Sequence, residues 1–229
     1  MSTNISINKI KCAVFDLDGT LLNTIKTINY YLNFALEKNS LGIVPEEKCR
    51  DFVGDGAVKL ISRALDYLNC RQDDVFKKVF ADYNEAYNSD PYYLTEIYDG
   101  IEELLQQLKN RGIILAVLSN KPDFATGAAV AYFFPDAFNA AYGAREGIAL
   151  KPNPEALLSL LNELGVSPYE VAYIGDSEPD VLTAKNAKVA LPISVTWGFR
   201  TEEQLRAAGA LELINHPQEI LPLIQPDAK

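Results

Sequence analysis

Histidine is almost absent from this chain of 229 residues, which contains only His216. A mechanism built on a histidine base or a histidine-bound metal is therefore disfavoured, and the position of His216 beside Pro217 favours a surface or loop role. Cysteine is also scarce: Cys12, Cys49 and Cys70 are odd in number and form no CxxC pair. These cysteines are typical of a reduced, cytoplasmic protein rather than a disulfide framework.

Long apolar runs and basic surface are lacking too. No hydrophobic run approaches a membrane span, and residues 1–11 contain no apolar core of a secretion signal. The 21 Lys and Arg residues are outnumbered by 31 Asp and Glu, giving a net charge of −10. That balance disfavours nucleic acid, which binds basic surfaces. We therefore expect a cytoplasmic protein with neither a membrane nor a nucleic-acid partner.

The most informative feature that is present is a pair of carboxylates after an apolar run. Cys12–Phe15 is typical of a buried parallel strand, and Asp16 and Asp18 follow it directly. Gly19 and Thr20 then break the extended pattern. Open α/β sheets bind ligands outside the carboxyl ends of their strands. Acids held there are costly unless a cation neutralises them; the alternative is an ordinary acidic turn.

Other segments favour the cation. Apolar strands are predicted at residues 113–118 and 171–174, and both run into polar residues. A lysine also stands in a Lys-Pro-Asn-Pro loop before a helical pattern. Mg²⁺ prefers carboxylates and phosphate oxygens, while a hydroxyl and an ammonium can hold the remaining phosphate oxygens. The polar residues brought to this edge are Ser119, Asn120, Lys151, Asp176 and Asp180.

With these residues the chain resembles the haloacid dehalogenase superfamily, and within it the phosphoglycolate phosphatase-like hydrolases. Four motifs carry the resemblance in order along nearly the whole chain. They are DxDGT at residues 16–20, the serine at Ser119, the lysine at Lys151 in a KPxP setting, and GDxxxD at residues 175–180.

The resemblance implies a role for each matched residue. Asp16 would be the nucleophile that forms an aspartyl-phosphate, and Asp18 would act as general acid and then base. Ser119 and Lys151 would bind phosphoryl oxygens, and Thr20 and Asn120 are expected beside them at the substrate. Mg²⁺ would be held by Asp16, the backbone carbonyl of Asp18 and Asp176, with Asp180 close behind.

Asp18 also separates chemistries within the superfamily. Dehalogenases usually lack a carboxylate there, because a halide leaves without a proton whereas an alkoxide needs an acid. The chain departs from a frequent family pattern at Asn23, where an Asp is common, so Asn23 is not expected to be catalytic.

Residues 23–90 are predicted to form a helical cap inserted into the core. Apolar residues recur there at helical spacing, with no convincing strand. Strand and helix patterns alternate afterwards, one helix being expected to start at an Asp99 cap. The fold expected is α/β: a Rossmann-like, mostly parallel sheet flanked by helices, with residues 1–22 and 91–229 as the catalytic core.

The cap is expected to select the substrate. Gly54, Asp55 and Gly56 match a GxG element of phosphoglycolate phosphatases and could approach the substrate, although a helix–helix turn explains them equally well. Lys59 and Arg63 could meet a substrate carboxylate or form a solvated face. Arg200, after a strand predicted near residues 193–197, is a weaker candidate for substrate contact.

We therefore expect a Mg²⁺-dependent phosphatase acting on a small anionic organophosphate, as a monomer or homodimer. Two alternatives stay open. A sugar phosphomutase of the same fold would return the phosphoryl group to the substrate. A regulatory phosphate-binding protein would lack catalysis, against which the intact set of motif residues argues.

Overall fold

A computed structural model describes residues 10–224 of the chain. Within that range six strands build one sheet. The expectation about a secretion signal falls almost wholly on residues 1–9, which lie outside the described range. The six strands are β1 (Cys12–Phe15), β4 (Ile114–Pro122), β5 (Ala140–Ala144), β6 (Val171–Gly175), β7 (Leu191–Val195) and β8 (Glu212–Ile214).

The strand order is β5-β4-β1-β6-β7-β8, and all neighbouring pairs are parallel. The predicted mostly parallel, Rossmann-like sheet is thereby confirmed. Strand β1 pairs with both β4 and β6, so the ends of these three strands lie next to one another. The polar residues that follow β1 and β6, and those in the last part of β4, are thus brought to one edge.

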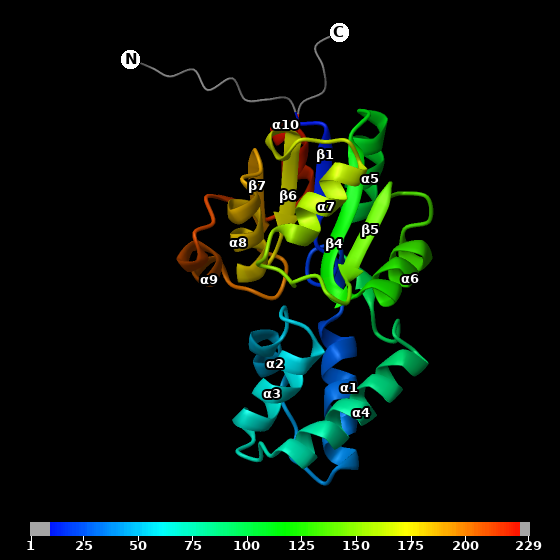
Figure 1. The fold of residues 1–229 in the computed structure, drawn as a ribbon, viewed down its shortest axis with the longest axis vertical. Helices are drawn as coiled ribbons and strands as arrows, with labels where there is room; N and C mark the ends of the chain where they lie inside the picture. The colour runs from blue at the N-terminus through cyan, green and yellow to red at the C-terminus, as the bar shows by residue number, and fades with distance from the viewer. Residues whose placement is uncertain (1–9, 225–229) are drawn as a thin grey trace.

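Helices cover both faces of the sheet (Figure 1). They are α5 (Ile101–Asn110), α6 (Asp123–Phe133), α7 (Glu155–Glu163), α8 (Glu178–Ala187), α9 (Glu202–Ala208) and α10 (Ile220–Leu223), with 3₁₀ turns at Pro168–Glu170 and Pro217–Glu219.

The sheet has two apolar faces because successive side chains of a strand point in opposite directions. Ala13 and Phe15 of β1 pack in one cluster with α5, α6 and α10. Cys12 and Val14 pack in a second cluster with α7 and α8. The central strand is therefore buried on both sides, which explains why it reads as a continuous apolar run.

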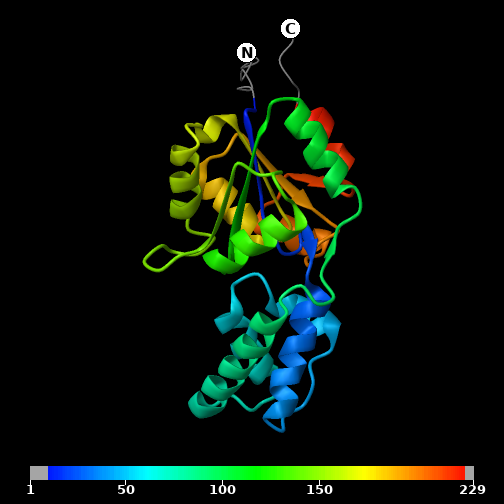
Figure 2. The same ribbon diagram turned by 90° about the vertical axis from the view of Figure 1, so that its right-hand side faces the viewer.

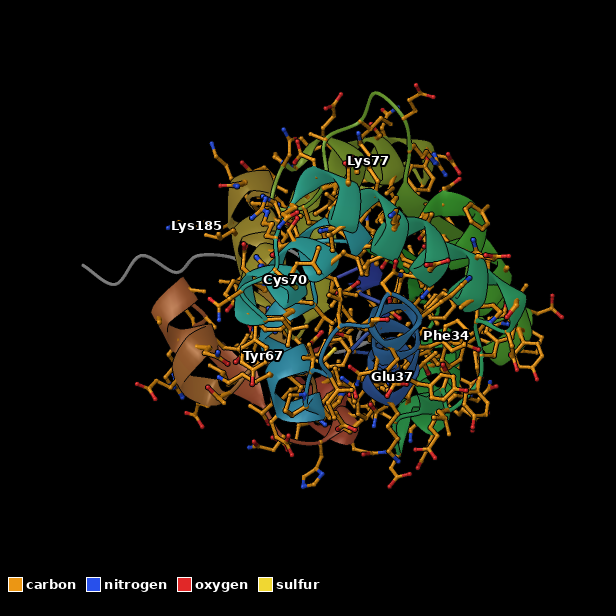
Figure 3. All side chains as sticks on the ribbon, turned by 90° about the horizontal axis from the view of Figure 1, so that it is seen from below. Phe34, Glu37, Tyr67, Cys70, Lys77 and Lys185 are labelled. Atoms are coloured by element: carbon orange, nitrogen blue, oxygen red, sulfur yellow. The ribbon has the colours of Figure 1, made fainter. Side chains whose placement is uncertain are left out.

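Four helices form a separate helical lobe (residues 25–89) below the carboxyl ends of the strands (Figures 1 and 2). A third apolar cluster joins them, and Figure 3 shows their outer side, where Phe34 and Tyr67 are exposed. Their position matches the expected helical insertion, but the residue boundaries of the two-domain division stay a prediction. The helices are α1 (Ile25–Lys38), α2 (Glu46–Phe52), α3 (Ala57–Tyr67) and α4 (Asp73–Ser89).

A short ribbon connects the helical lobe with the sheet. Strand β2 (Leu22–Asn23) pairs antiparallel with β3 (Glu96–Ile97), so the chain enters and leaves the lobe side by side.

Helix α5 starts differently from expectation. Gly100, in a left-handed conformation at φ 82°, is its N-cap, and no side chain caps it. The predicted Asp99 cap is therefore wrong. In residues 10–224 we find no helix both long and apolar enough to cross a membrane.

Candidate active site

Three carboxylates and one lysine meet at the carboxyl ends of β1 and β6. Oxygens of Asp16, Asp176 and Asp180 lie within 4.8 Å of one another, and all three residues are buried. The ammonium of Lys151 lies 2.9 Å from Oδ1 of Asp16 and 2.7 Å from Oδ1 of Asp180. It also donates to the Leu118 carbonyl of β4, at 3.3 Å. The lysine from the loop thus contacts strand β4, the residue that follows β1 and the first turn of helix α8.

Hydrogen bonds fix two of these carboxylates. Asp176 accepts from the Thr20 hydroxyl at 2.9 Å and from the Phe199 backbone N–H at 2.8 Å. Asp180 accepts from Tyr173 at 3.1 Å and from the hydroxyl and N–H of Ser177 at 2.5 and 3.1 Å. With Lys151 added, Asp180 is the more fully occupied of the two, which suits a supporting role.

Glycines make room for this cluster. A Cβ on Gly19 or Gly198 would collide with the Asp176 carboxylate, and one on Gly175 would collide with Asp180. Gly19 also has φ of 90°, a conformation that L side chains rarely adopt. The glycine of the first motif is therefore required both by the turn and by the acid packed against it.

The cluster is short of positive charge. Three ionised carboxylates with one ammonium leave two negative charges uncompensated. Burial, and then Asp180, raise the pKa of Asp176 to about 7, despite hydrogen bonds from Phe199 and Thr20 that lower it. Burial and Asp180 also raise the pKa of Asp16 well above its usual range, although Lys151 opposes this. A divalent cation would offset that charge, and hard carboxylate oxygens are the donors that Mg²⁺ prefers.

A second charged group lies on the side of the helical lobe. Lys121 Nζ lies 3.4 Å from Oδ2 of Asp18 and donates to the Tyr87 hydroxyl of α4 at 2.5 Å. Burial disfavours the charged form of Lys121, but Asp18 and Tyr87 outweigh it and raise the lysine pKa. Sequence reasoning missed both residues. The signal available was the position of Lys121, two residues after Ser119 in the same strand.

A cavity separates the sheet edge from the helical lobe. From the core it is lined by the polar residues Asp16, Asp18, Ser119, Asn120 and Lys121 and by the apolar residues Pro122, Ala125 and Phe199. The lobe contributes apolar, aromatic and amide side chains together with the backbone of two glycines. Those residues are Ile28, Val53, Gly54, Gly56, Ala57, Leu60, Tyr83, Asn84, Tyr87 and Asn88.

Two of the predicted substrate residues make structural contacts. Asn120 donates to the Gly54 carbonyl at 3.0 Å and accepts from the Lys151 backbone N–H at 2.9 Å, so its amide ties the lobe to the loop. Thr20 is buried against Asp176. Ser119 faces the cavity, as do Gly54 and Gly56.

The other charged candidates lie outside the cavity lining. Asp55 pairs with Arg63 at 2.5 Å. Lys59 is exposed on α3. Arg200 is buried, pairs with Glu178 at 2.7 Å and donates to the carbonyls of Arg50 and Val53 at the end of α2. Through these contacts Arg200 holds the lobe against the core.

A phosphoryl-handling α/β hydrolase is the class that this fold and this carboxylate–lysine cluster define. The family model of the haloacid dehalogenase-like hydrolases matches residues 13–192. The chain belongs to that family, and it is a phosphatase.

Similar proteins agree with this assignment. The chain is 33% identical over 197 residues to a phosphoglycolate phosphatase of Haemophilus influenzae, covering 83% of this chain and 88% of that protein. A crystal structure from Lactobacillus delbrueckii, of a protein assigned as a phosphoglycolate phosphatase, superposes with a TM-score of 0.90 at 31% identity, covering 96% and 100% of the two chains. A protein assigned as a β-phosphoglucomutase from Thermotoga maritima shares the fold, with a TM-score of 0.70 at 22% identity and coverage of 94% and 98%.

Proposed function

We propose that the protein is a Mg²⁺-dependent phosphomonoesterase that works through an aspartyl-phosphate on Asp16. The observation that carries the proposal is the buried cluster of three carboxylates around Lys151, of which Asp16 lines the cavity. A carboxylate can attack an anionic phosphate only where positive charge offsets the repulsion. Lys151, 2.9 Å from Asp16, is placed to supply part of that charge.

Each side chain then has a defined task. An Asp16 oxygen attacks phosphorus, and the bond to the ester oxygen breaks. Asp18 gives its proton to the departing alkoxide and later takes one from the water that hydrolyses the aspartyl-phosphate. Ser119 and Lys151 hold the non-transferring phosphoryl oxygens. Thr20 and Asn120 act behind them, on Asp176 and on the lysine loop.

Asp16 and Asp176, with the backbone carbonyl of Asp18, would hold the metal. Mg²⁺ would supply charge neutralisation for nucleophile and phosphate together. The carboxylate of Asp180 would keep Lys151 in place from 2.7 Å.

We propose a small anionic organophosphate, such as phosphoglycolate, as the substrate class. The similarity to phosphoglycolate phosphatases supports this choice. Residues 23–90 would act as the cap that closes the cavity over the substrate and excludes bulk water. The competing mutase reaction has support only from a fold shared at 22% identity.

The test is phosphate release from a panel of phosphate esters, with and without Mg²⁺, by wild type and Asp16→Asn. We expect Mg²⁺-dependent release by wild type alone, and a ³²P-labelled acid-stable adduct on Asp16 only in wild type. A sugar monophosphate included in the panel separates the two reactions. If the positional isomer of this sugar phosphate forms faster than free phosphate, the mutase reaction is favoured and the proposed hydrolase reaction is refuted.

A further inference from the structure

The cavity wall contains little positive charge on the side where a leaving group would lie. Among the described residues that line the cavity, Lys121 is the one cationic side chain. The lobe side presents aromatic, amide and apolar groups and no charged side chain. An anion on the substrate, kept away from the Asp16 carboxylate by repulsion, would therefore have a single cation to meet.

Lys121 is held in place but not saturated. Its two contacts with the Asp18 carboxylate are 3.4 and 3.5 Å, longer than the usual N–H···O distance of about 2.7–3.2 Å. The bond to Tyr87 is short, at 2.5 Å, and the ammonium also lies 4.8 Å from the centre of the Tyr87 ring. The side chain of Lys121 is only 9% exposed, so an ion pair formed there would be weakly screened.

Tyr87 is itself rigidly packed. Its ring stacks on Tyr83 at 5.6 Å and meets Tyr31 edge to face at 5.6 Å. The lobe therefore fixes the Tyr87 hydroxyl that accepts the hydrogen bond from Lys121. Lys121 belongs to β4, but a helix of the lobe positions its ammonium. Such pre-organisation lowers the cost of binding an anion there.

The geometry also limits the length of the leaving group. An ester oxygen protonated by Asp18 would lie about 2.7 Å from that carboxylate. Because Lys121 is 3.4 Å from the same carboxylate, the ester oxygen lies within about 6 Å of Nζ. A carboxylate two or three bonds from the ester oxygen spans that gap. A longer chain would carry its charge past Lys121, and the lobe residues that line the cavity offer it no second cation.

We propose that Lys121 binds the anionic end of the leaving group, and that Tyr87 is the residue that positions it. The substrate selected would be a compact phosphate monoester with one carboxylate close to the ester oxygen. This inference rests on the proposed phosphatase function and assigns the residue responsible for its selectivity.

The experiment compares two esters that differ in one charge: 2-phosphoglycolate and 2-hydroxyethyl phosphate, which carries a neutral hydroxymethyl group in place of the carboxylate. The readout is the ratio of their kcat/KM values in wild type, Lys121→Met and the matched control Lys59→Met. Loss of Lys121 also disturbs Asp18, which affects both esters, so the ratio isolates the contact with the carboxylate. We expect wild type to prefer the acid, Lys121→Met to reduce that preference by about a hundredfold, and Lys59→Met to retain it.

A ratio that changes by less than about twofold in Lys121→Met would overturn the assignment. Equal kcat/KM for both esters in wild type would also overturn it, while leaving the phosphatase function standing. Failure of wild type to release phosphate from any ester would instead refute the proposed function.

Tyr87→Phe provides a second variant, because it removes one hydroxyl and keeps the packed ring even if Lys121→Met does not fold. We expect it to raise KM for the carboxylate ester more than for the neutral ester, with a smaller change in kcat. Parallel changes for both esters would show that Tyr87 does not position the lysine. Lys121→Arg should recover part of the preference for the acid, because the charge is restored.

Discussion

The sheet edge and the helical lobe bury opposite kinds of side chain. At the sheet edge Asp16, Asp176, Asp180 and Lys151 are all buried, whereas no charged side chain of residues 25–89 is. The lobe closes on an apolar cluster instead. Burial of like charges costs stability and burial of apolar area provides it. The comparison teaches that the sheet edge holds buried charge at a cost in stability, while the lobe is stabilised by the burial of apolar side chains.

The sharpest test of this division is Asp16→Asn. We expect turnover to fall by at least about 10⁴-fold, because an amide cannot form the acyl phosphate. Metal-free stability should not fall, because one of the crowded negative charges is removed. Phosphate release and thermal melting measure the two effects, and exposed Asp74→Asn is the control. Turnover within about tenfold of wild type, after deamidation has been excluded, would refute the role of Asp16.

Asp176→Ala should produce the next largest effect, through loss of metal. Removal of this carboxylate takes away one of the two aspartates proposed to hold the metal, so Mg²⁺ affinity should fall about 10- to 100-fold or more. Calorimetric titration of chelator-treated protein measures affinity, and phosphate release measures turnover. Glu178→Gln is the matched control, because this nearby acid pairs with Arg200.

Ca²⁺ should bind wild type yet support little turnover, because its coordination shell is larger and looser. Unaltered Mg²⁺ affinity in Asp176→Ala would place the metal elsewhere.

The lobe should respond in the opposite way. Leu65 is fully buried in its apolar cluster, so Leu65→Ala should lower the free energy of unfolding by about 3 kcal/mol. The chemical step should be retained at temperatures where the variant is folded. Urea unfolding, and kcat measured at least roughly 10 °C below the melting midpoint of the variant, give both quantities. Leu211→Ala, at a site 86% exposed, should change stability by less than about 0.5 kcal/mol. A loss below about 1 kcal/mol for Leu65→Ala would mean that the lobe is not well packed there.

A further prediction concerns how the stability of the metal-free protein depends on pH. Because burial raises the pKa of Asp176 to about 7, the native state keeps a proton that the unfolded chain loses above pH ~4. Stability should therefore fall as pH rises from about 4 to 7, and Mg²⁺ should raise the melting temperature more at pH 8 than at pH 5. Thermal melts with chelator and with Mg²⁺ test this. In Asp176→Asn the melting temperature of the metal-free protein should depend less on pH. A melting temperature of the metal-free protein that rises over this pH range would contradict the sign.

Much of the core was predictable because its signals are local. The strands over 12–15 and 171–175 are short apolar runs, and their polar ends must meet wherever parallel strands adjoin. The candidate metal residues Asp16 and Asp176 could be proposed from this rule together with the family resemblance. Sequence reasoning placed Ser119 after a strand, whereas the structure extends β4 through it to Pro122.

The features that were missed depend on contacts distant in sequence or on very short elements. Lys121 and Tyr87 are 34 positions apart in different layers, so neither reveals the other in the sequence. Helix α2 has only seven residues, of which Cys49 alone is buried, and therefore lacks an amphipathic pattern. The β2–β3 ribbon has two residues on each side, too few for any alternation to appear. At Asp99 the capping pattern was present, but Gly100 takes the cap position itself.

The β2–β3 ribbon joins both ends of the lobe to the core at one place, so the lobe can be exchanged as a unit. Leu22 lies opposite Ile97 and Asn23 opposite Glu96, so the two ends of the inserted segment are neighbours across one pair of strands. A different segment with adjacent ends could be joined at the same points without altering the order or register of the six-stranded sheet. Chimaeras joined at this ribbon would keep Asp16 and Asp18 in their native setting, so a change of substrate preference in them would test the proposed role of the cap.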